Sequence, residues 1–168
     1  MIKDEKIFAF LINVDHLSKG EKAVLARNHK LFKDAKYDVV LAIMKCIPDD
    51  VYVSESDYQL LLFIASVRCE LGDKKTVYPR NAVAEVICKM QSGDNKFSDL
   101  LQQDTTSGRV YPLMRRYLSM YKGPINTFAL YKDLLFWDQD EPSHENQNMK
   151  FMPVRYEWAN AFAKQSRH

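Results

Sequence analysis

Residues 54–72, SESDYQLLLFIASVRCELG, decide the fold of this chain. Apolar side chains in residues 57–71 fall almost all the way around a helix, which is the pattern of a helix buried on most of its sides. Ser54 is a favoured N-cap residue, and Gly72 tolerates the left-handed backbone that commonly follows a helix end. We therefore expect residues 57–71 to form the central helix of the N-terminal half of the protein.

Further helices are expected on both sides of this segment, because apolar residues recur at helical spacing between residues that start or stop helices. Ser18 and Glu21 have the spacing of a capping box, and Asn81 is a candidate N-cap. The expected helices cover residues 7–17, 19–33, 37–47, 57–71, 82–91, 97–102, 109–122, 127–137 and 154–162. Two β-prone segments, 51–54 and 76–78, are too isolated to make a sheet. The predicted fold class is all-α, a bundle of about eight or nine helices in two subdomains.

The polar sequence DTTSG at residues 104–108 is the best candidate for the boundary between these subdomains, since Asp, Thr, Ser and Gly cluster in loops. It predicts an N-terminal helical subdomain of residues 1–104 and a C-terminal helical subdomain of residues 105–168.

The last third of the chain carries aromatic residues at helical spacing. Two segments, 130–137 and 154–162, frame a polar and acidic spacer at residues 138–150. Trp137 and Trp158 are expected to anchor the core rather than to stack on bases, because large aromatic side chains bury most of their surface in folded domains.

The charge balance limits the nucleic-acid-binding classes to which the chain can belong. Its 24 basic and 22 acidic residues give a net charge of +2. The overall field of a strongly basic DNA-binding domain is therefore not expected, and any nucleic-acid contact must come from a local patch. With 46% hydrophobic residues and only 5 Gly and 6 Pro, the composition favours a globular helical protein.

Neither a membrane span nor an export signal is expected from the sequence. The longest apolar run, residues 60–67, is much shorter than the ~20 residues of a spanning helix, and residues 3–6 (KDEK) are charged instead of forming a signal-peptide pattern. We expect a cytoplasmic protein with no membrane partner. Cys46, Cys69 and Cys88 lack metal-ligand spacing and are expected to be small core residues.

The first candidate phosphate-binding group lies on the expected helix of residues 19–33. At 100° per residue, four lysines of this helix fall within one sector about 80° wide, with Arg27 beside them. These lysines are Lys19, Lys22, Lys30 and Lys33. A basic stripe of this kind suits phosphate neutralisation, but a solvated lysine-rich face explains it as well.

Two further basic groups are candidates for the same role. Lys74, Lys75 and Arg80 precede a helix N-terminus, where free backbone N–H groups favour anions, although the lysines could equally serve solubility. Arg115 and Arg116 diverge by 100° on a mostly apolar helix, and an ion pair with a nearby aspartate, Asp133 or Asp99, is the structural alternative for either. The candidate nucleic-acid-binding residues are Lys22, Arg27, Lys30, Lys74, Lys75, Arg80, Arg115 and Arg116.

Motifs for catalysis, metal binding or cofactor binding are not expected in this sequence. It contains no His-x-x-x-His, no glycine-rich phosphate loop and no Gly-x-Ser-x-Gly. We therefore predict no enzyme activity, no metal and no cofactor. A small helical hydrolase that uses paired Asp or Glu residues with a divalent metal is the remaining enzymatic alternative.

Three features of the sequence together resemble the CasB family, the small subunits of the type I-E CRISPR surveillance complex Cascade. They are the stretch GEKAVLAR at residues 20–27, the paired arginines Arg115 and Arg116, and the block of residues 125–137 followed by Trp158, Ala159 and Phe162. The resemblance covers nearly the whole chain in length and order, and its C-terminal block is the most specific part.

The resemblance implies an all-α protein of two subdomains that pairs with a second copy of itself and with other Cascade subunits in antiviral defence. It implies no enzymatic activity. Members of this family line the path of the guide RNA and the target strand, offer basic residues to the displaced strand, and so stabilise the R-loop. The alternative from the residues alone is a helical adaptor that binds only protein.

Carried over by position, Arg27 matches the basic site that follows the family's glycine, and Arg115 with Arg116 matches its dibasic helix. Residues 74–80 fall in a loop where members often carry basic residues. This chain departs from the family pattern at two places that concern individual contacts. The family commonly has two adjacent arginines where this chain has Ala26 and Arg27. It also has a turn made of a small residue and a glycine where this chain has Arg80 and Asn81.

Overall fold

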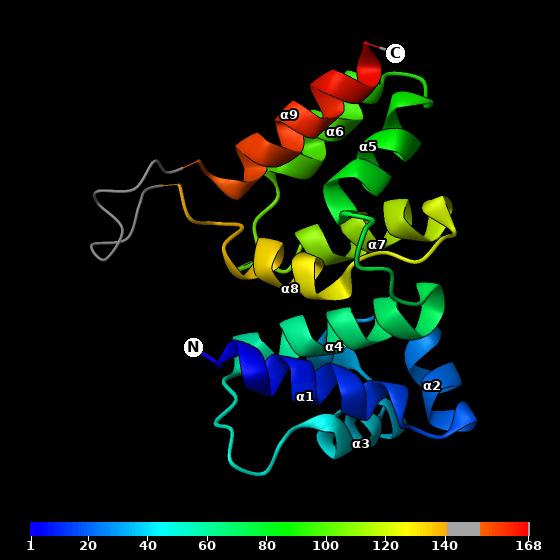
Figure 1. Cartoon of the computed structure of the whole chain (residues 1–168), viewed down its shortest axis with the longest axis vertical. Coiled ribbons are helices and arrows are strands. Elements are labelled where there is room, and N and C mark those ends of the chain that lie inside the picture. The colour runs from blue at the N-terminus through cyan, green and yellow to red at the C-terminus, as the bar shows by residue number, and fades with distance from the viewer. Residues whose placement is uncertain (141–151, 168) are drawn as a thin grey trace.

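The computed structural model describes residues 1–140 and 152–167, which fold into two groups of α-helices (Figure 1). The lower group holds α1 (Asp4–Asp15), α2 (Lys19–Ala26), α3 (Tyr37–Cys46) and α4 (Glu55–Leu71), with a 3-10 turn η1 (Phe32–Asp34) between α2 and α3. The upper group holds α5 (Pro79–Cys88), α6 (Gly93–Gln102), α7 (Val110–Tyr121), α8 (Thr127–Leu135) and α9 (Val154–Ser166). Apart from one isolated β-bridge between Asp73 and Ile125, these residues contain no β-structure. The all-α prediction is confirmed.

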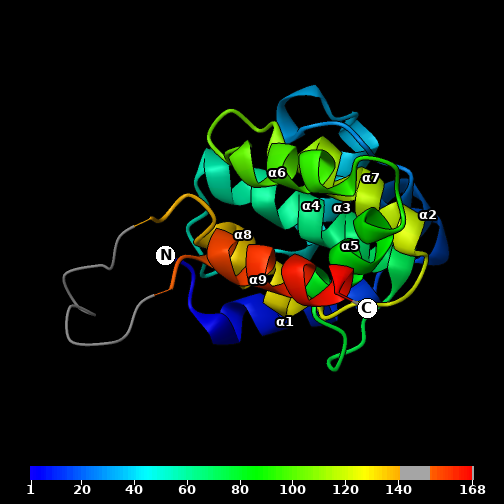
Figure 2. The same cartoon turned by 90° about the horizontal axis from the view of Figure 1, so that it is seen from above.

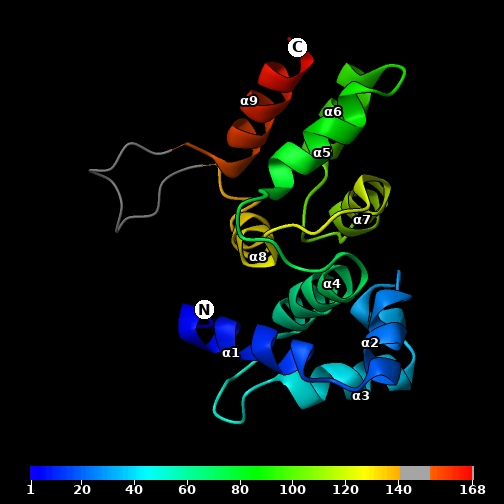
Figure 3. The ribbon, with the colours of Figure 1, turned by 45° about the vertical axis from the view of Figure 1, so that its right-hand side comes forward.

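Helix α4 lies between the two groups, as Figure 3 shows. It begins behind the predicted Ser54 cap, where Ser54 Oγ accepts the Asp57 N–H at 3.2 Å and the Asp57 carboxylate accepts the Ser54 N–H. It ends at Gly72, whose φ of 85° is the left-handed conformation that glycine adopts without strain. Residues 60–67 are all buried. The prediction of a central helix is confirmed, and α4 contacts helices of both groups, α1, α2 and α3 on one side and α7 and α8 on the other.

The predicted boundary at residues 104–105 does not match the packing. Helices α5 and α6 precede it, yet they pack against α7 and α9, which follow it. The polar residues that suggested a boundary satisfy one another in a tight connection: Asp104 accepts the Ser107 N–H at 2.7 Å, and Asp138 accepts the Thr105 N–H at 3.1 Å. The change from one group of helices to the other lies at the connection between α4 and α5.

Helix α2 is much shorter than predicted. It ends at Ala26 with Arg27 as its C-cap, whereas the periodicity predicted a helix to residue 33. Lys30 and Lys33 therefore lie on the connection to α3 and not on one helical stripe with Lys22, so the predicted stripe is wrong. The reason is tertiary, since Arg115 of α7 binds the carbonyl oxygens with which the helix would continue.

Helix α5 also begins earlier than predicted. Pro79 occupies its first position, where the missing N–H and the fixed φ suit a helix start, and Tyr78 is the N-cap. Asn81 lies in the first turn and is not the cap. Helix α6 likewise begins at Gly93 rather than at residue 97, whereas most other helix ends agree with the prediction within about two residues.

The predicted aromatic anchors are confirmed. Trp137 and Trp158 are both 0% exposed, and their rings meet edge to face with centroids 5.2 Å apart. Each indole N–H has a partner, the Gln103 carbonyl oxygen at 2.8 Å and the Asp133 carboxylate at 2.9 Å. The predicted spacer at residues 138–150 falls largely outside the described residues. In the part of the chain that the structure describes, every helix is too short or too polar to cross a bilayer.

Candidate nucleic-acid interface

The connection between α2 and α3, residues 27–36, concentrates exposed cations. Arg27, Lys30, Lys33 and Lys36 are all exposed, and none of them forms an ion pair with a carboxylate of the described residues. Asp34 is the one carboxylate in these ten residues. We call residues 27–36 the cationic segment. Its unpaired charges are available to a negatively charged ligand.

Three of these cations surround one hollow of the surface. Arg27, Lys30 and Lys36 line a hollow of about 350 Å³ together with Asn28, His29 and one carboxylate, that of Asp38, which accepts the Val39 N–H at 2.8 Å. Ammonium and guanidinium groups are strong donors to phosphate oxygens, so this hollow has the chemistry of a backbone-phosphate site.

Lys33 faces a different hollow. That second hollow, of about 760 Å³, lies between η1, the start of α4 and the connection at residues 105–108. Hydroxyl groups of Ser54, Ser56 and Thr106 line it beside Lys33. The cationic segment therefore presents its charges on two adjoining surfaces.

Lys36 is the functional candidate that the sequence analysis missed. A signal was present, because Lys30, Lys33 and Lys36 recur every third residue. Both the 3-10 helix and the polyproline II helix have three residues per turn. The segment uses both conformations: η1 is a 3-10 turn, and Ala35 and Lys36 have φ near −70° with ψ of 146° and 155°.

Arg115 lies beneath the cationic segment and not on the surface. It is 3% exposed, and its guanidinium donates to the carbonyl oxygens of Ala26 at 2.7 Å and Asn28 at 3.1 Å and to the Glu70 carboxylate at 2.7 Å. Burial lowers the pKa of the Arg115 guanidinium, and the Glu70 charge opposes this shift. An arginine stays protonated in proteins even so. This geometry does not support the prediction that Arg115 contacts nucleic acid, and its ion-pair partner is Glu70 and not the suggested Asp133 or Asp99.

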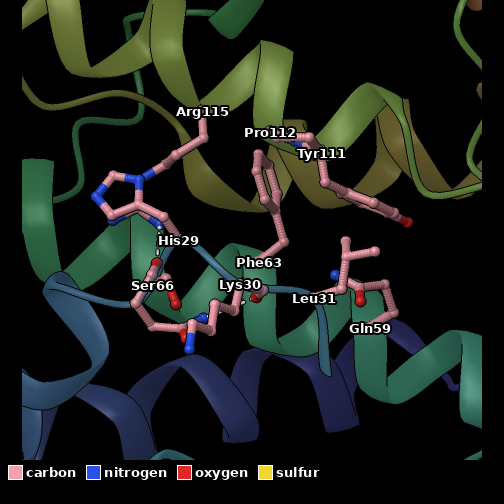
Figure 4. Close-up of a pocket in the computed structure, with 10 residues that line it drawn as sticks. His29, Lys30, Leu31, Gln59, Phe63, Ser66, Tyr111, Pro112 and Arg115 are labelled. Atoms are coloured by element: carbon pink, nitrogen blue, oxygen red, sulfur yellow. Dashed lines mark hydrogen bonds between the residues drawn. The ribbon is translucent and has the colours of Figure 1, made fainter. Parts of the chain in front are cut away.

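Figure 4 shows the side chains of α7 and α4 that contact the segment from two sides. Arg115 reaches from α7 toward His29, while Phe63 and Ser66 rise from α4. They line a small, partly open cavity of about 20 Å³, in which the buried Ser66 Oγ has no hydrogen-bond partner in the described protein. A cavity of this size has room for one water molecule beside that hydroxyl. Side chains of α4 and α7 thus support the cationic segment from the protein interior.

The second predicted group lies on the loop of residues 73–78. Lys74 and Lys75 are exposed and unpaired with any described carboxylate. The loop backbone is held at both ends, because the Lys74 N–H donates to the Ile125 carbonyl at 2.9 Å and the Asn126 N–H donates to the Val77 carbonyl at 2.7 Å. These contacts hold the two lysines in place at an ordered turn.

Arg80 follows this loop. Its guanidinium lies over the ring of Tyr78, 4.7 Å from the ring centroid, which is a cation–π contact. Tyr78 is 42% exposed, so a basic and aromatic pair borders the loop.

The two basic groups are not brought together. In Figure 2 the cationic segment lies at the upper edge of the molecule and the loop of residues 73–78 at the lower edge, so the two groups form separate surfaces. Lys22 belongs to neither. The hydrogen bond from Arg68 lowers the pKa of Asp15 and the Lys22 charge lowers it further, which places Lys22 beside that ion pair. Arg116 is exposed on α7 with no ion pair to a described carboxylate.

Neither a family model nor a curated protein sequence matches this chain. Across residues 1–140 and 152–167, His, Cys, Asp and Glu side chains form no group of three that could hold a metal ion. The resemblance to CasB therefore stays a prediction from the residues that carry it.

Proposed function

We propose that this protein is a non-catalytic nucleic-acid-binding subunit, and that it serves as the small subunit of a type I-E Cascade complex, as its CasB-like sequence implies. The observation that supports binding best is the hollow lined by Arg27, Lys30 and Lys36, three exposed cations without carboxylate partners among the described residues. In this role the protein contacts sugar-phosphate backbone and reads no sequence.

Three phosphate contacts give weak binding by themselves. Each neutralised phosphate adds about −0.9 to the log–log salt slope on duplex DNA and about −0.7 on a single strand. The hollow thus contributes a slope of roughly −2 on a single strand. Inside an assembly that already holds the nucleic acid, such contacts act at a high effective concentration. They can then tip the nearly balanced strand exchange of R-loop formation.

The separate loop of residues 73–78 fits the same proposal. A complex that carries a guide RNA–target hybrid and a displaced DNA strand presents phosphates on more than one side of each subunit. Two cationic sites on opposite sides of one small protein would let it contact two strands, or one strand and a neighbouring complex component. A second copy of the chain and other Cascade subunits are the protein partners that this role requires.

Charge reversal of the hollow tests the proposal. The triple variant Arg27→Glu, Lys30→Glu and Lys36→Glu should bind a single-stranded oligonucleotide at least about tenfold more weakly, with a salt slope reduced by roughly 2. Fluorescence anisotropy at several salt concentrations measures both. The matched control reverses three exposed cations of the upper group, Lys122, Lys164 and Arg167, which changes the net charge equally. Equal losses of affinity in the two variants would mean that only the net charge matters, and would contradict the proposal.

The adaptor alternative has one observation in its favour. Helix α3 exposes an apolar stripe at positions i, i+4 and i+7, formed by Tyr37 (87% exposed), Leu41 (62%) and Met44 (42%). Exposed apolar stripes commonly mark protein contacts. If the charge-reversed triple variant still supports R-loop formation in an otherwise complete assembly, while Leu41→Glu blocks assembly, the adaptor is the better description.

A further inference from the structure

The backbone of the cationic segment is held in place by side chains from other helices. Continuation of α2 would require the Lys30 N–H to bond the Ala26 carbonyl, and the Phe32 N–H to bond the Asn28 carbonyl. Both carbonyl oxygens are instead bound by Arg115, at 2.7 and 3.1 Å. The Phe32 N–H donates to the Gln59 side chain of α4 at 2.8 Å. Tertiary hydrogen bonds therefore replace the helical ones.

The position of Arg115 is itself strongly determined. Its side chain is 4% exposed, and a buried cation is tolerated only when charge and hydrogen-bonding partners surround it. Glu70 supplies the charge at 2.7 Å, and the same carboxylate oxygen accepts the Ser119 hydroxyl at 3.1 Å. The planar guanidinium reaches both carbonyls and the carboxylate at once, which an ammonium group does not reproduce.

The two bound carbonyls flank the first cation of the segment. Arg27 lies between Ala26 and Asn28, so its backbone is held on both sides. The Asn28 side chain passes this constraint onward, because its Nδ2 donates to the Lys30 carbonyl at 3.0 Å. Arg27 and Lys30 line the hollow described above. The backbone conformation that brings them to one hollow thus depends on a residue nearly ninety positions along the chain.

We infer that Arg115 is a positioning residue for nucleic-acid binding: it sets the shape of residues 26–30, and through them the placement of Arg27 and Lys30, without touching the ligand. This inference rests on the proposed function. The role inferred for Arg115 differs from the one that the resemblance implies, which is direct contact of the dibasic pair at residues 115–116 with phosphate.

Arg155 provides a matched control. It also donates to two backbone carbonyls, those of Trp137 at 2.8 Å and Leu101 at 2.9 Å, and to one carboxylate, Asp138 at 3.1 Å. Neither carbonyl belongs to the cationic segment. Arg115→Lys and Arg155→Lys thus remove the same kind of contact and keep the charge, but only the first releases residues 26–30.

The experiment measures oligonucleotide affinity, salt slope, thermal midpoint and amide hydrogen exchange for both variants. Arg115→Lys should bind a single-stranded DNA about tenfold more weakly, with faster exchange at residues 27–31. Arg155→Lys should lower the thermal midpoint and keep wild-type affinity within about twofold. Introduced into Arg27→Ala with Lys30→Ala, Arg115→Lys should cause no additional loss of affinity, since the side chains that it positions are gone.

Wild-type affinity in a folded Arg115→Lys protein would overturn the inference, and so would equal losses in both lysine variants. If Arg115→Lys does not fold, Gln59→Ala releases the Phe32 N–H of the same segment without exposing a buried charge, and it should show the same loss of affinity. The proposed function fails separately: it fails if Arg27→Ala with Lys30→Ala binds as tightly as the wild type.

Discussion

Arg115 and Arg155 perform the same chemistry in two regions of the molecule. Each is a largely buried arginine whose guanidinium binds two backbone carbonyls and one carboxylate. Arg115 holds an exposed connection that carries four cations without a carboxylate partner among the described residues, whereas Arg155 holds residues around the buried Trp137. The comparison shows that an arginine bound to two backbone carbonyls and a carboxylate does not by itself indicate function. Function depends on which side chains the backbone held by that arginine exposes to solvent.

The contacts around the two arginines also differ. Around Arg155, Trp137 and Trp158 are fully buried and Phe162 stacks on Phe97 with centroids 4.4 Å apart, so apolar contact dominates. Around Arg115, hydrogen bonds contribute more: Arg115 binds the Ala26 carbonyl and Gln59 accepts the Phe32 N–H, while one ring contact, Phe32 on Tyr58 with centroids 5.0 Å apart, adds packing. Loss of packing should therefore affect the first region most, and loss of hydrogen bonds the second.

The largest expected effect tests the apolar region. Trp158→Ala removes a fully buried indole and its hydrogen bond to Asp133, which should lower the free energy of unfolding by about 4 kcal/mol. Urea denaturation measures this loss. Trp158→Phe should lose less, because it keeps most of the ring. The folded Trp158→Ala protein should retain wild-type hydrogen exchange at residues 27–31, and faster exchange there would break the separation between the two regions.

A smaller effect comes from a carboxyl group in the same apolar region. Burial raises the pKa of Asp133 from 3.8 to about 6, against the opposing effects of the Trp158 hydrogen bond and the Arg80 charge, while Glu157 adds to the rise. The folded protein thus binds this proton more tightly than the unfolded chain. The contribution to stability is full below about pH 4 and is lost as the pH rises through about 6.

Asp133→Asn removes this pH dependence and keeps an acceptor for the Trp158 N–H. It should match wild-type stability near pH 4 and exceed it above pH 7 by on the order of 2 kcal/mol. Denaturation midpoints from pH 4 to pH 8 measure the difference. A difference that does not change with pH would contradict the raised pKa. Hydrogen exchange at residues 27–31 should stay the same, because Asp133 lies outside the cationic segment.

The smallest effect tests the second basic loop. Lys74→Glu with Lys75→Glu should weaken single-strand binding by about threefold, since two exposed lysines make screened contacts. Because this loop and the cationic segment lie at opposite edges of the molecule, its loss should add to that of the Arg27, Lys30 and Lys36 reversal. Lys164→Glu with Arg167→Glu is the charge-matched control. A combined loss smaller than the sum would indicate that one strand uses both sites.

Particular residues show how far sequence reasoning reached. The cap at Ser54, the end at Gly72 and the burial of residues 60–67 followed from local pattern, and the structure agrees. The extended helix through residue 33 also followed from local pattern and is wrong, because a side chain 89 positions away binds the Ala26 carbonyl. Lys36 was missed because it lies beyond residue 33, where the predicted helix ended.

The candidate site was less predictable than the fold. Arg27 and Lys30 were identified as cations, but their release from helix α2 was not. Arg115 was predicted to contact nucleic acid, with an ion pair to Asp133 or Asp99 as the alternative, but its partner Glu70 lies 45 positions away and nothing local marks it. The relative placement of the two basic groups required the packing of α4 between the helix groups.

The amino-acid sequence by itself determined that this chain forms helices, which of them lies at the centre, and which aromatic side chains are buried. Capping, helical periodicity and apolar spacing act over about four residues, so they can be recognised without coordinates. Only the tertiary structure decided where α2 ends, that Arg115 is buried and binds backbone carbonyls, and that Arg27, Lys30 and Lys36 line one hollow. Those outcomes depend on hydrogen bonds and ion pairs between distant residues, and such partners are chosen by the packing of whole helices.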